Sequence, residues 1–223
     1  MSTKLFILGL PGSGKSTTAR HIVDYIEQQK SDCQIVRIND YDILYDMFKA
    51  DNDSKFRPTE HGGFDVIDHD ILDTALKTAE QEAKRSEQPT YNQDHAALKP
   101  LLILIEFARD DYRLALQQFS PQFLRGANFL FLDARIDICK ARVRERVAHP
   151  QTPDDHEVSE YIFDSYYAKD SAHVLPANVM ADYYIEKQSV KALDNNGAFD
   201  DIRGEVEVFV DTIVKHTSNK IHS

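Results

Sequence analysis

The sequence has little material for disulfide or metal sites. It contains only two cysteines, Cys33 and Cys139, in a chain of 223 residues. This number excludes a disulfide framework, and the two residues do not have the spacing of a pair of metal ligands. The nine histidines show no H-x-x-x-H pattern and no pairing with cysteine, which favours histidines scattered over the surface over a metal site. The low cysteine content predicts a reducing environment.

Long apolar runs and positive charges are scarce as well. No run approaches the ~18 apolar residues of a membrane-spanning helix, and the first residues show no signal-peptide pattern, so we expect a cytoplasmic protein without a membrane partner.

Lysine and arginine together number 26 against 37 acidic residues, a formal net charge of −11. Because affinity for nucleic acid depends on neutralised phosphates, this balance excludes a general binder of long nucleic acid. A polynucleotide would need a local basic pocket.

The chain is still long and apolar enough to bury a sizeable core. Its hydrophobic content is 42%, and it shows no repeat, low-complexity segment or clear linker. We therefore expect one domain over residues 1–223.

A glycine-rich stretch follows the first apolar run. Residues 5–17 read LFILGLPGSGKST, which satisfies the pattern G-x-x-x-x-G-K-[ST]. Glycines let the loop wrap closely around a polyphosphate, and the positive end of the following helix dipole attracts it. Lys15 is expected to reach the β- and γ-phosphates, and the Ser16 hydroxyl to ligate Mg²⁺. The residues expected to bind the nucleotide here are Gly9, Pro11, Gly12, Ser13, Gly14, Lys15, Ser16 and Thr17.

Apolar runs alternate with helical patterns along the rest of the chain, and a strand before the glycine-rich stretch with a helix after it argues against a chance turn. Strands are expected over residues 4–8, 34–38, 101–107, 128–132 and 190–193. Helices are expected over residues 17–29, 41–56, 66–85, 110–118, 136–147, 158–167 and within 199–216. Residues 86–90 predict a turn, residues 152–156 an acidic loop, and residues 170–187 have no clear pattern. The alternation predicts an α/β fold with a parallel sheet and helices on both faces.

Acidic residues follow two of the expected strands. Since open α/β sheets bind ligands at the carboxyl ends of their strands, Asp40 is the first candidate for a base and Asp42 the second, although either could be a helix N-cap. Glu106 could hold Mg²⁺ through a water, or it could be a structural acid paired with Arg109. Arg109 itself could anchor an anionic substrate or form a surface ion pair.

The expected helix over residues 136–147 is rich in arginine. Arg142 and Arg146 are four residues apart and share a helical face, whereas Arg144 lies on another side. Guanidinium groups are always charged and bind phosphoryl oxygens through a planar fork of donors, which suits phosphoryl transfer. The alternative is a solvated helix face whose arginines pair with Glu145 and nearby acids.

These motifs together resemble the P-loop kinases, a family that includes nucleoside monophosphate kinases, deoxynucleoside kinases, polynucleotide 5′-kinases and zeta-toxin-like kinases. The resemblance implies a three-layer αβα fold, a five-stranded parallel sheet ordered 2-3-1-4-5 and a helical lid. It implies that Asp40 is the base, that Arg142 and Arg146 belong to the lid, and that Asn195 and Asn196 lie in a loop against the adenine base. A simple turn is the alternative for this loop. Residues 106–110, EFARD, depart from the corresponding run in thymidylate and deoxynucleoside kinases, which disfavours a nucleoside substrate.

The sequence thus predicts an ATP- and Mg²⁺-dependent kinase that transfers the γ-phosphoryl group to a hydroxyl or phosphate of a small molecule or nucleotide. The acceptor region is expected within residues 41–95 and the lid within residues 135–170. A nucleotide-dependent regulatory ATPase and a zeta-like toxin kinase acting on a sugar nucleotide are the alternatives. The expected roles are catalysis for Lys15, Asp40, Arg142 and Arg146, substrate binding for Asp42 and Arg109, and metal binding for Ser16 and Glu106.

Overall fold

A computed structural model of the chain describes residues 2–29, 31–60, 63–88, 99–152, 155–169 and 175–219. Its centre is a five-stranded parallel sheet in the order β2-β5-β1-β6-β7. Numbered within this sheet alone, the order is 2-3-1-4-5, so the predicted topology is confirmed. The strands are β1 (Ser2–Leu8), β2 (Gln34–Asn39), β5 (Leu101–Phe107), β6 (Asn128–Asp133) and β7 (Val190–Asp194).

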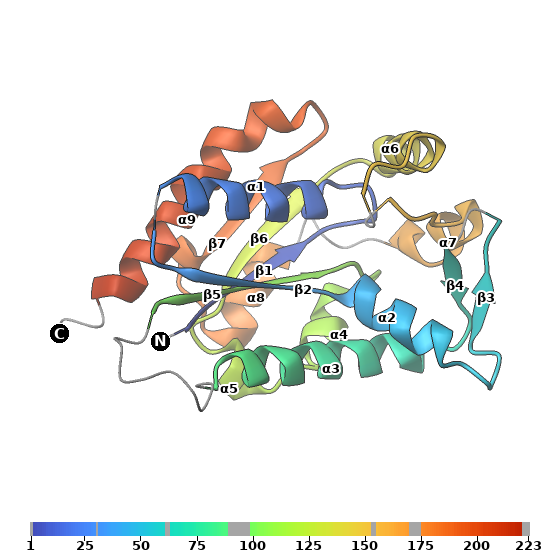
Figure 1. Ribbon diagram of the computed structural model, residues 1–223, viewed down its shortest axis with the longest axis horizontal. Coiled ribbons are helices and arrows are strands. Elements are labelled where there is room, and N and C mark those ends of the chain that lie inside the picture. The colour runs from blue at the N-terminus through green and yellow to red at the C-terminus, as the bar shows by residue number, and fades with distance from the viewer. Residues whose placement is uncertain are drawn as a thin grey trace.

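Helices cover both faces of the sheet, as Figure 1 shows. One face carries α1 (Lys15–Gln28) and α9 (Phe199–Asn219). The opposite face carries α2 (Asp40–Lys49), α3 (Asp70–Ser86), α4 (Tyr112–Leu116), α5 (Pro121–Leu124) and α8 (Leu175–Tyr183).

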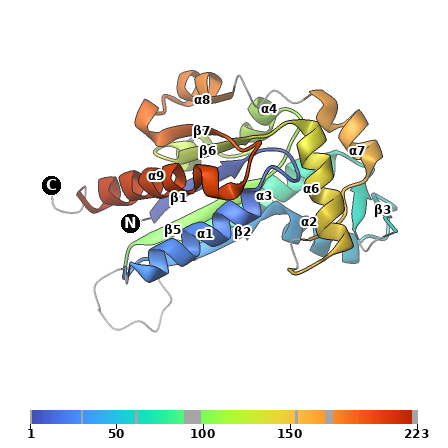
Figure 2. The same ribbon diagram turned by 90° about the horizontal axis from the view of Figure 1, so that it is seen from above.

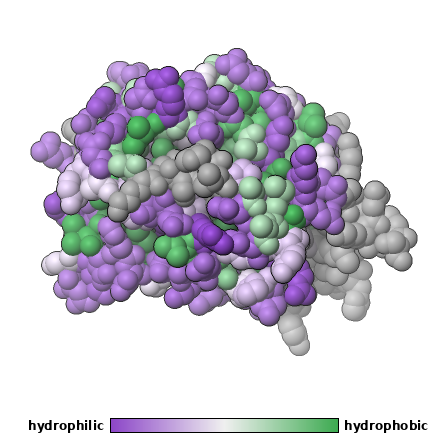
Figure 3. Space-filling view, turned by 180° about the vertical axis from the view of Figure 1, so that it is seen from behind, coloured by the Kyte–Doolittle hydropathy of each residue, from purple (hydrophilic) through white to green (hydrophobic). Residues whose placement is uncertain are grey.

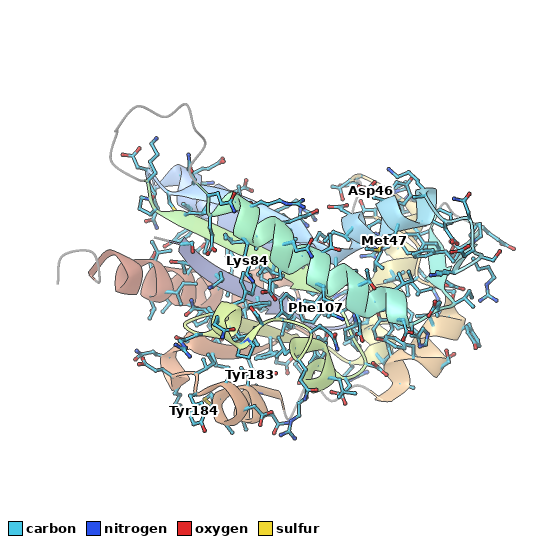
Figure 4. All side chains as sticks on the ribbon, turned by 90° about the horizontal axis from the view of Figure 1, so that it is seen from below. Asp46, Met47, Lys84, Phe107, Tyr183 and Tyr184 are labelled. Carbon is cyan, nitrogen blue, oxygen red and sulfur yellow. The ribbon has the colours of Figure 1, made fainter. Side chains whose placement is uncertain are left out.

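The central strand β1 contributes side chains to both layers. Leu5 and Ile7 pack with residues of α1 and α9, whereas Phe6 and Leu8 pack with the helices of the other face. Successive side chains of a strand point to opposite faces, so the continuous apolar run is buried on both sides. Figure 4 shows the second layer from below, with Phe107 of β5 inside it and Tyr184 at the surface beside α8.

A short hairpin between α2 and α3 was not predicted. Strands β3 (Phe56–Pro58) and β4 (Phe64–Val66) pair antiparallel. The helix expected over residues 41–56 therefore ends at Lys49, and the helix expected from residue 66 begins at Asp70. The rings of Phe56 and Phe64 are buried and meet edge to face at 5.3 Å. This packing of aromatic residues on a hairpin outweighs the weak helical periodicity of the segment.

Capping side chains explain other differences at helix ends. The helix expected from residue 110 begins at Tyr112 because Asp111 accepts a hydrogen bond from Leu114 N. The helix expected over residues 158–167 is reduced to α7 (Glu160–Ser165), capped by Ser159 and followed by a 3₁₀ turn, η1 (Tyr167–Lys169).

Helix α8 occupies part of the segment over residues 170–187, for which the sequence showed no clear pattern, and a second 3₁₀ turn, η3 (Lys187–Ser189), precedes β7. Part of the turn expected over residues 86–90 lies outside the described residues.

The helix α6 (Ile136–Ala148), α7 and the hairpin gather at the end of the molecule opposite the two termini, as Figure 2 shows. A small apolar cluster joins Leu10 of the phosphate loop with Cys139 and Val143 of α6 and Phe163 of α7. This cluster packs the segment expected as a lid directly against the expected phosphate loop.

The surface is mostly hydrophilic on the face seen in Figure 3. Exposed large apolar side chains, such as Ile67, Leu114 and Val208, come from different elements. Within the described ranges, no helix has both the length and the hydropathy needed to cross a bilayer.

Candidate active site

A cavity of about 440 Å³ lies at the carboxyl ends of the central strands, where open α/β sheets bind ligands. It is lined by residues of the phosphate loop and α1, the β2–α2 junction, the hairpin, the end of β5, the lid segment and the β7–α9 loop. Most of the predicted site residues line it: Pro11, Gly12, Gly14, Lys15, Ser16, Thr17, Asp40, Arg109, Arg142, Arg146 and Asn195. Gly9, Ser13, Asp42, Glu106 and Asn196 do not.

The phosphate loop has a backbone that only glycine adopts easily. Gly12 has φ +80° and Gly14 has φ +100°. A Cβ atom on Gly12 would lie 2.4 Å from the carbonyl oxygen of Cys139, and one on Gly14 would lie 2.5 Å from the side-chain nitrogen of Asn195. Ser13 is buried, and its hydroxyl has no hydrogen-bond partner among the described residues. A narrow glycine cradle with an unused buried donor fits the phosphates of a nucleotide.

Lys15 lies at the start of α1 and crosses back over the loop. Its ammonium group donates to the carbonyl oxygens of Gly9 and Leu10, both at 2.9 Å. Burial lowers the pKa of Lys15 to about 8, although the charges of Asp40 and Glu106 oppose this shift. A partly desolvated cation in the cradle is suited to bind phosphate oxygens.

Asn195 and Asn196 have different positions. Asn195 is buried, and its side-chain amide donates to the carbonyl oxygen of Ser13 at 2.7 Å. Asn196 instead accepts a hydrogen bond from Arg135 N at 2.8 Å and does not line the cavity. The structure therefore places Asn195 in the cavity beside the phosphate loop and does not bring Asn196 there.

Asp40 and Arg109 form a buried ion pair in the cavity. Arg109 Nη1 lies 2.5 Å from Asp40 Oδ2, and their side chains are 4% and 11% exposed. Burial raises the pKa of Asp40, and the charges of Arg109 and Lys15 offset part of the increase. The surface ion pair considered for Arg109 is therefore wrong. Asp40 is not the helix cap either, because Asn39 accepts the capping hydrogen bond from Tyr41 N.

Two other acidic candidates are placed differently from the prediction. Asp42 is exposed on the first turn of α2 and does not line the cavity. Glu106 is almost fully buried, but its two oxygens accept from Arg37 and not from the expected Arg109. This pairing follows from the sheet register, which sets Arg37 on β2 beside Leu104, two residues before Glu106. Glu106 thus acts on Lys15 through its charge, from outside the cavity.

The arginines of α6 divide as their spacing predicts. Arg142 donates to the carbonyl oxygen of Gly197 at 2.5 Å, and Arg146 donates to the carbonyl oxygen of His156 at 3.0 Å. Both line the cavity. Arg144 is exposed and pairs with Glu160. The exposed, ion-paired face of the helix therefore describes Arg144, while Arg142 and Arg146 line the cavity beside the phosphate loop.

Sequence reasoning missed the aromatic wall of the cavity formed by α2, the hairpin and the segment after α6. The Tyr41 ring stacks on His156 of the lid segment, with ring centroids 3.3 Å apart, and on Phe64 of the hairpin at 5.3 Å. Asp65 of the hairpin is 4% exposed, lines the cavity and accepts from Arg57 at 2.8 Å. Tyr41 and Phe64 carried no sequence signal for this wall, because aromatic residues are as common in ordinary cores.

A magnesium ion has a plausible ligand in the Ser16 hydroxyl, which lines the cavity beside Lys15. Among the described residues, no group of three or more His, Cys, Asp or Glu side chains forms a metal site. The donor set therefore fits a metal that is carried largely by nucleotide phosphates and water.

Solved structures share this fold at low identity. The APS kinase of Mycobacterium tuberculosis, determined with AMPPNP and APS, has a TM-score of 0.55 and 12% identity over 94% of this chain and 98% of its own. Shikimate kinase from Acinetobacter baumannii, determined with shikimate, has a TM-score of 0.51 and 10% identity over 97% of this chain and 95% of its own. Likeness at this identity shows the fold alone. No curated protein matches the sequence.

The sequence itself matches a family model over residues 6–148, more than half of the chain. The matched range contains the phosphate loop, Asp40, Arg109 and the arginines of α6. A direct sequence match thus accompanies the structural features, which are the phosphate loop, the five-stranded parallel sheet and the cavity at its carboxyl edge. The chain belongs to the phosphoribulokinase/uridine kinase family and is an ATP-dependent kinase.

Proposed function

We propose that the protein transfers the γ-phosphoryl group of ATP to a hydroxyl group of a small molecule bound between the hairpin and the lid segment. The observation that supports this most strongly is that one cavity contains both the phosphate cradle, with Lys15, and a buried carboxylate, Asp40. A base beside the phosphate site distinguishes transfer to an acceptor from a simple nucleotide switch.

In the proposed reaction, the acceptor hydroxyl oxygen attacks the γ-phosphorus, and the bond from this phosphorus to the bridging oxygen of ADP breaks. The hydroxyl proton passes to the carboxylate of Asp40. Lys15, Arg142 and Arg146 stabilise the negative charge on the phosphoryl oxygens. The three cations reach the cavity from α1 and α6.

Ser16 would hold Mg²⁺, with Glu106 contributing at most through a water, since its oxygens are engaged by Arg37. Bound Mg²⁺ supplies positive charge that orients and neutralises the phosphates. Asn195 and Arg142 would fix the β7–α9 loop at the nucleotide end of the cavity, because they bond to Ser13 and Gly197.

The acceptor would lie beside residues 41–88 and the start of the segment after β5, under the lid; residues 89–95 of the expected acceptor region lie outside the described residues. Tyr41, Phe64 and His156 offer it an aromatic wall, and Arg109 offers it a buried cation. A predominantly apolar wall with a few polar groups is typical of sites for small ligands.

The test is a screen of sugars, polyols, hydroxy acids, nucleosides and nucleotides for ADP release that depends on the acceptor, with Mg²⁺ present. We expect at least one class to raise ADP release, with phosphorylated product detected by mass spectrometry. A rate that no acceptor changes would instead support the regulatory ATPase. Protein that binds no nucleoside triphosphate would contradict both functions.

A further inference from the structure

The carboxylate proposed as the base is held by a buried cation. Asp40 Oδ2 accepts from Arg109 Nη1 at 2.5 Å, and Arg109 is 4% exposed. An ion pair stabilises the charged form of a carboxylate and occupies one of its oxygens. While the pair persists, Asp40 is a weaker proton acceptor than the same buried carboxylate without Arg109 would be, because the charge of Arg109 offsets part of the increase in its pKa.

Arg109 is anchored independently of Asp40. Its Nη1 also donates to the carbonyl oxygen of Ala108 at 2.6 Å, and its Nη2 donates to the carbonyl oxygen of Leu72 at 2.9 Å. Its Nε–H group has no partner among the described residues. The guanidinium can therefore remain in place when Asp40 turns away, and it retains donors for another anion.

A neutral group of the acceptor would be an unfavourable partner for Arg109 in place of Asp40. Asp40 is the one carboxylate that pairs with Arg109 among the described residues, and a buried guanidinium that loses such a partner is left with an uncompensated charge, which is costly in a protein interior. Tyr166 and Tyr167 also influence Arg109 electrostatically, but burial raises the pKa of both tyrosines, so they stay neutral, and the nearby Asp110 is hydrogen-bonded to Tyr166. A group that separates Arg109 from Asp40 must bring its own negative charge.

We propose that the acceptor carries, besides its reacting hydroxyl, a carboxylate or phosphate monoester that binds Arg109 and thereby releases Asp40 to act as the base. This inference rests on the proposed kinase function. Without an acceptor, Asp40 stays paired and does not activate water, so the ion pair suppresses hydrolysis of ATP. Lys15 from α1 also faces Asp40, and it is drawn to the nucleotide phosphates when ATP is bound.

The first test uses the unchanged protein and pairs of acceptors that differ in one group. Hydroxy acids and phosphorylated polyols form two arms, and the corresponding neutral alcohols and polyols form the third. We expect phosphorylated product from one of the two anionic arms, which also tells carboxylate from phosphate. A neutral acceptor used with an equal or greater kcat/KM would overturn the inference. If phosphorylation of that neutral acceptor were still lost in Asp40→Asn, the proposed kinase function would stand.

The second test needs no acceptor. With ATP and Mg²⁺ alone, Arg109→Gln should hydrolyse ATP faster by roughly tenfold, a small part of what a positioned base can contribute. The double variant Arg109→Gln/Asp40→Asn should lose this gain, which a loosened structure would not explain. The pH profile should change as well, because hydrolysis by the single variant should rise through the ionisation of Asp40 and the double variant should lack that step.

Arg113→Gln is the matched control. Arg113 also pairs with an aspartate, Asp182, at 2.7 Å, but its side chain is 57% exposed and does not line the cavity. The Arg113→Gln variant should hydrolyse ATP at the wild-type rate. A folded Arg109→Gln variant that binds ATP and hydrolyses it no faster than Arg113→Gln would refute the role of the ion pair. If Arg109→Gln does not fold, Arg109→Met removes the charge while keeping the length of the side chain, and its rate of ATP hydrolysis is compared with that of Arg113→Met.

Discussion

The side-chain amide of Asn195 donates a 2.7 Å hydrogen bond to the carbonyl oxygen of Ser13 and thereby joins the β7–α9 loop to the phosphate loop. The two residues are 182 positions apart in the sequence. Asn195 is 2% exposed, and its Nδ2 would meet a Cβ atom on Gly14 at 2.5 Å. The amide thus holds the β7–α9 loop against the phosphate loop at Ser13 and Gly14.

Asn195→Ala should weaken binding of ATP. Loss of one buried hydrogen bond costs about 1 kcal/mol, which corresponds to a roughly fivefold increase in Kd. Calorimetric titration with ATP and Mg²⁺ measures this. Asn52→Ala, which removes an exposed amide that bonds only to the nearby Ala50 carbonyl, is the control. Equal affinities for the two variants would show that the Asn195–Ser13 bond does not support the nucleotide site.

Lys15 should make ATP affinity depend on pH. Its pKa is lowered by burial to about 8, so the free protein loses this positive charge as the pH rises through 8. ATP should therefore bind more weakly at pH 9 than at pH 7. Lys15→Arg should remove this dependence because guanidinium stays protonated over the whole range. Lys15→Ala should abolish turnover of ATP. If the wild-type protein bound ATP with the same affinity at pH 7 and pH 9, the role of the Lys15 charge in binding ATP would be contradicted.

Asp40→Asn should separate binding from transfer. The amide keeps the size of the side chain but cannot accept the proton, so transfer should fall by roughly 10²- to 10⁴-fold while ATP affinity changes little. The comparison is Asp42→Asn, since Asp42 is exposed and outside the cavity. Single-turnover transfer to the acceptor found by screening measures both variants. Loss of transfer in Asp42→Asn with normal transfer in Asp40→Asn would reverse the assignment.

Gly12→Ala should damage both stability and nucleotide binding. At φ +80° an alanine is strained by about 1–3 kcal/mol, and its Cβ would meet the Cys139 carbonyl oxygen at 2.4 Å. Thermal unfolding and ATP titration should both show the loss. Gly204→Ala is the control within α9, where a Cβ would have no neighbour within 4 Å, and there we expect stabilisation of about 0.5–1 kcal/mol. A Gly12→Ala variant as stable as Gly204→Ala would exclude a tight cradle.

Much of the site was predictable because its signals are local. Residues 9–16 contain the whole phosphate-loop pattern, and Arg142 and Arg146 share a face through the helical period alone. The hairpin was not predictable in this way. Phe56 and Phe64 are buried against each other and against Phe48 of α2, and such contacts between separate elements leave no short-range spacing in the sequence.

The sequence by itself determined the α/β class and the position of the phosphate loop, because periodicity and short-range spacing carry this information. The order of the strands was expected only from the resemblance to P-loop kinases, and the structure has the same order. Only the tertiary structure decided which charges meet. Arg37 with Glu106 and Arg109 with Asp40 are pairs of residues 69 positions apart, and both depend on how β2 and β5 lie side by side. Each of the two acidic residues at the strand ends meets an arginine, but only Asp40 lines the cavity, whereas Glu106 does not. The packing around a strand end therefore decides whether its acid can reach a bound ligand.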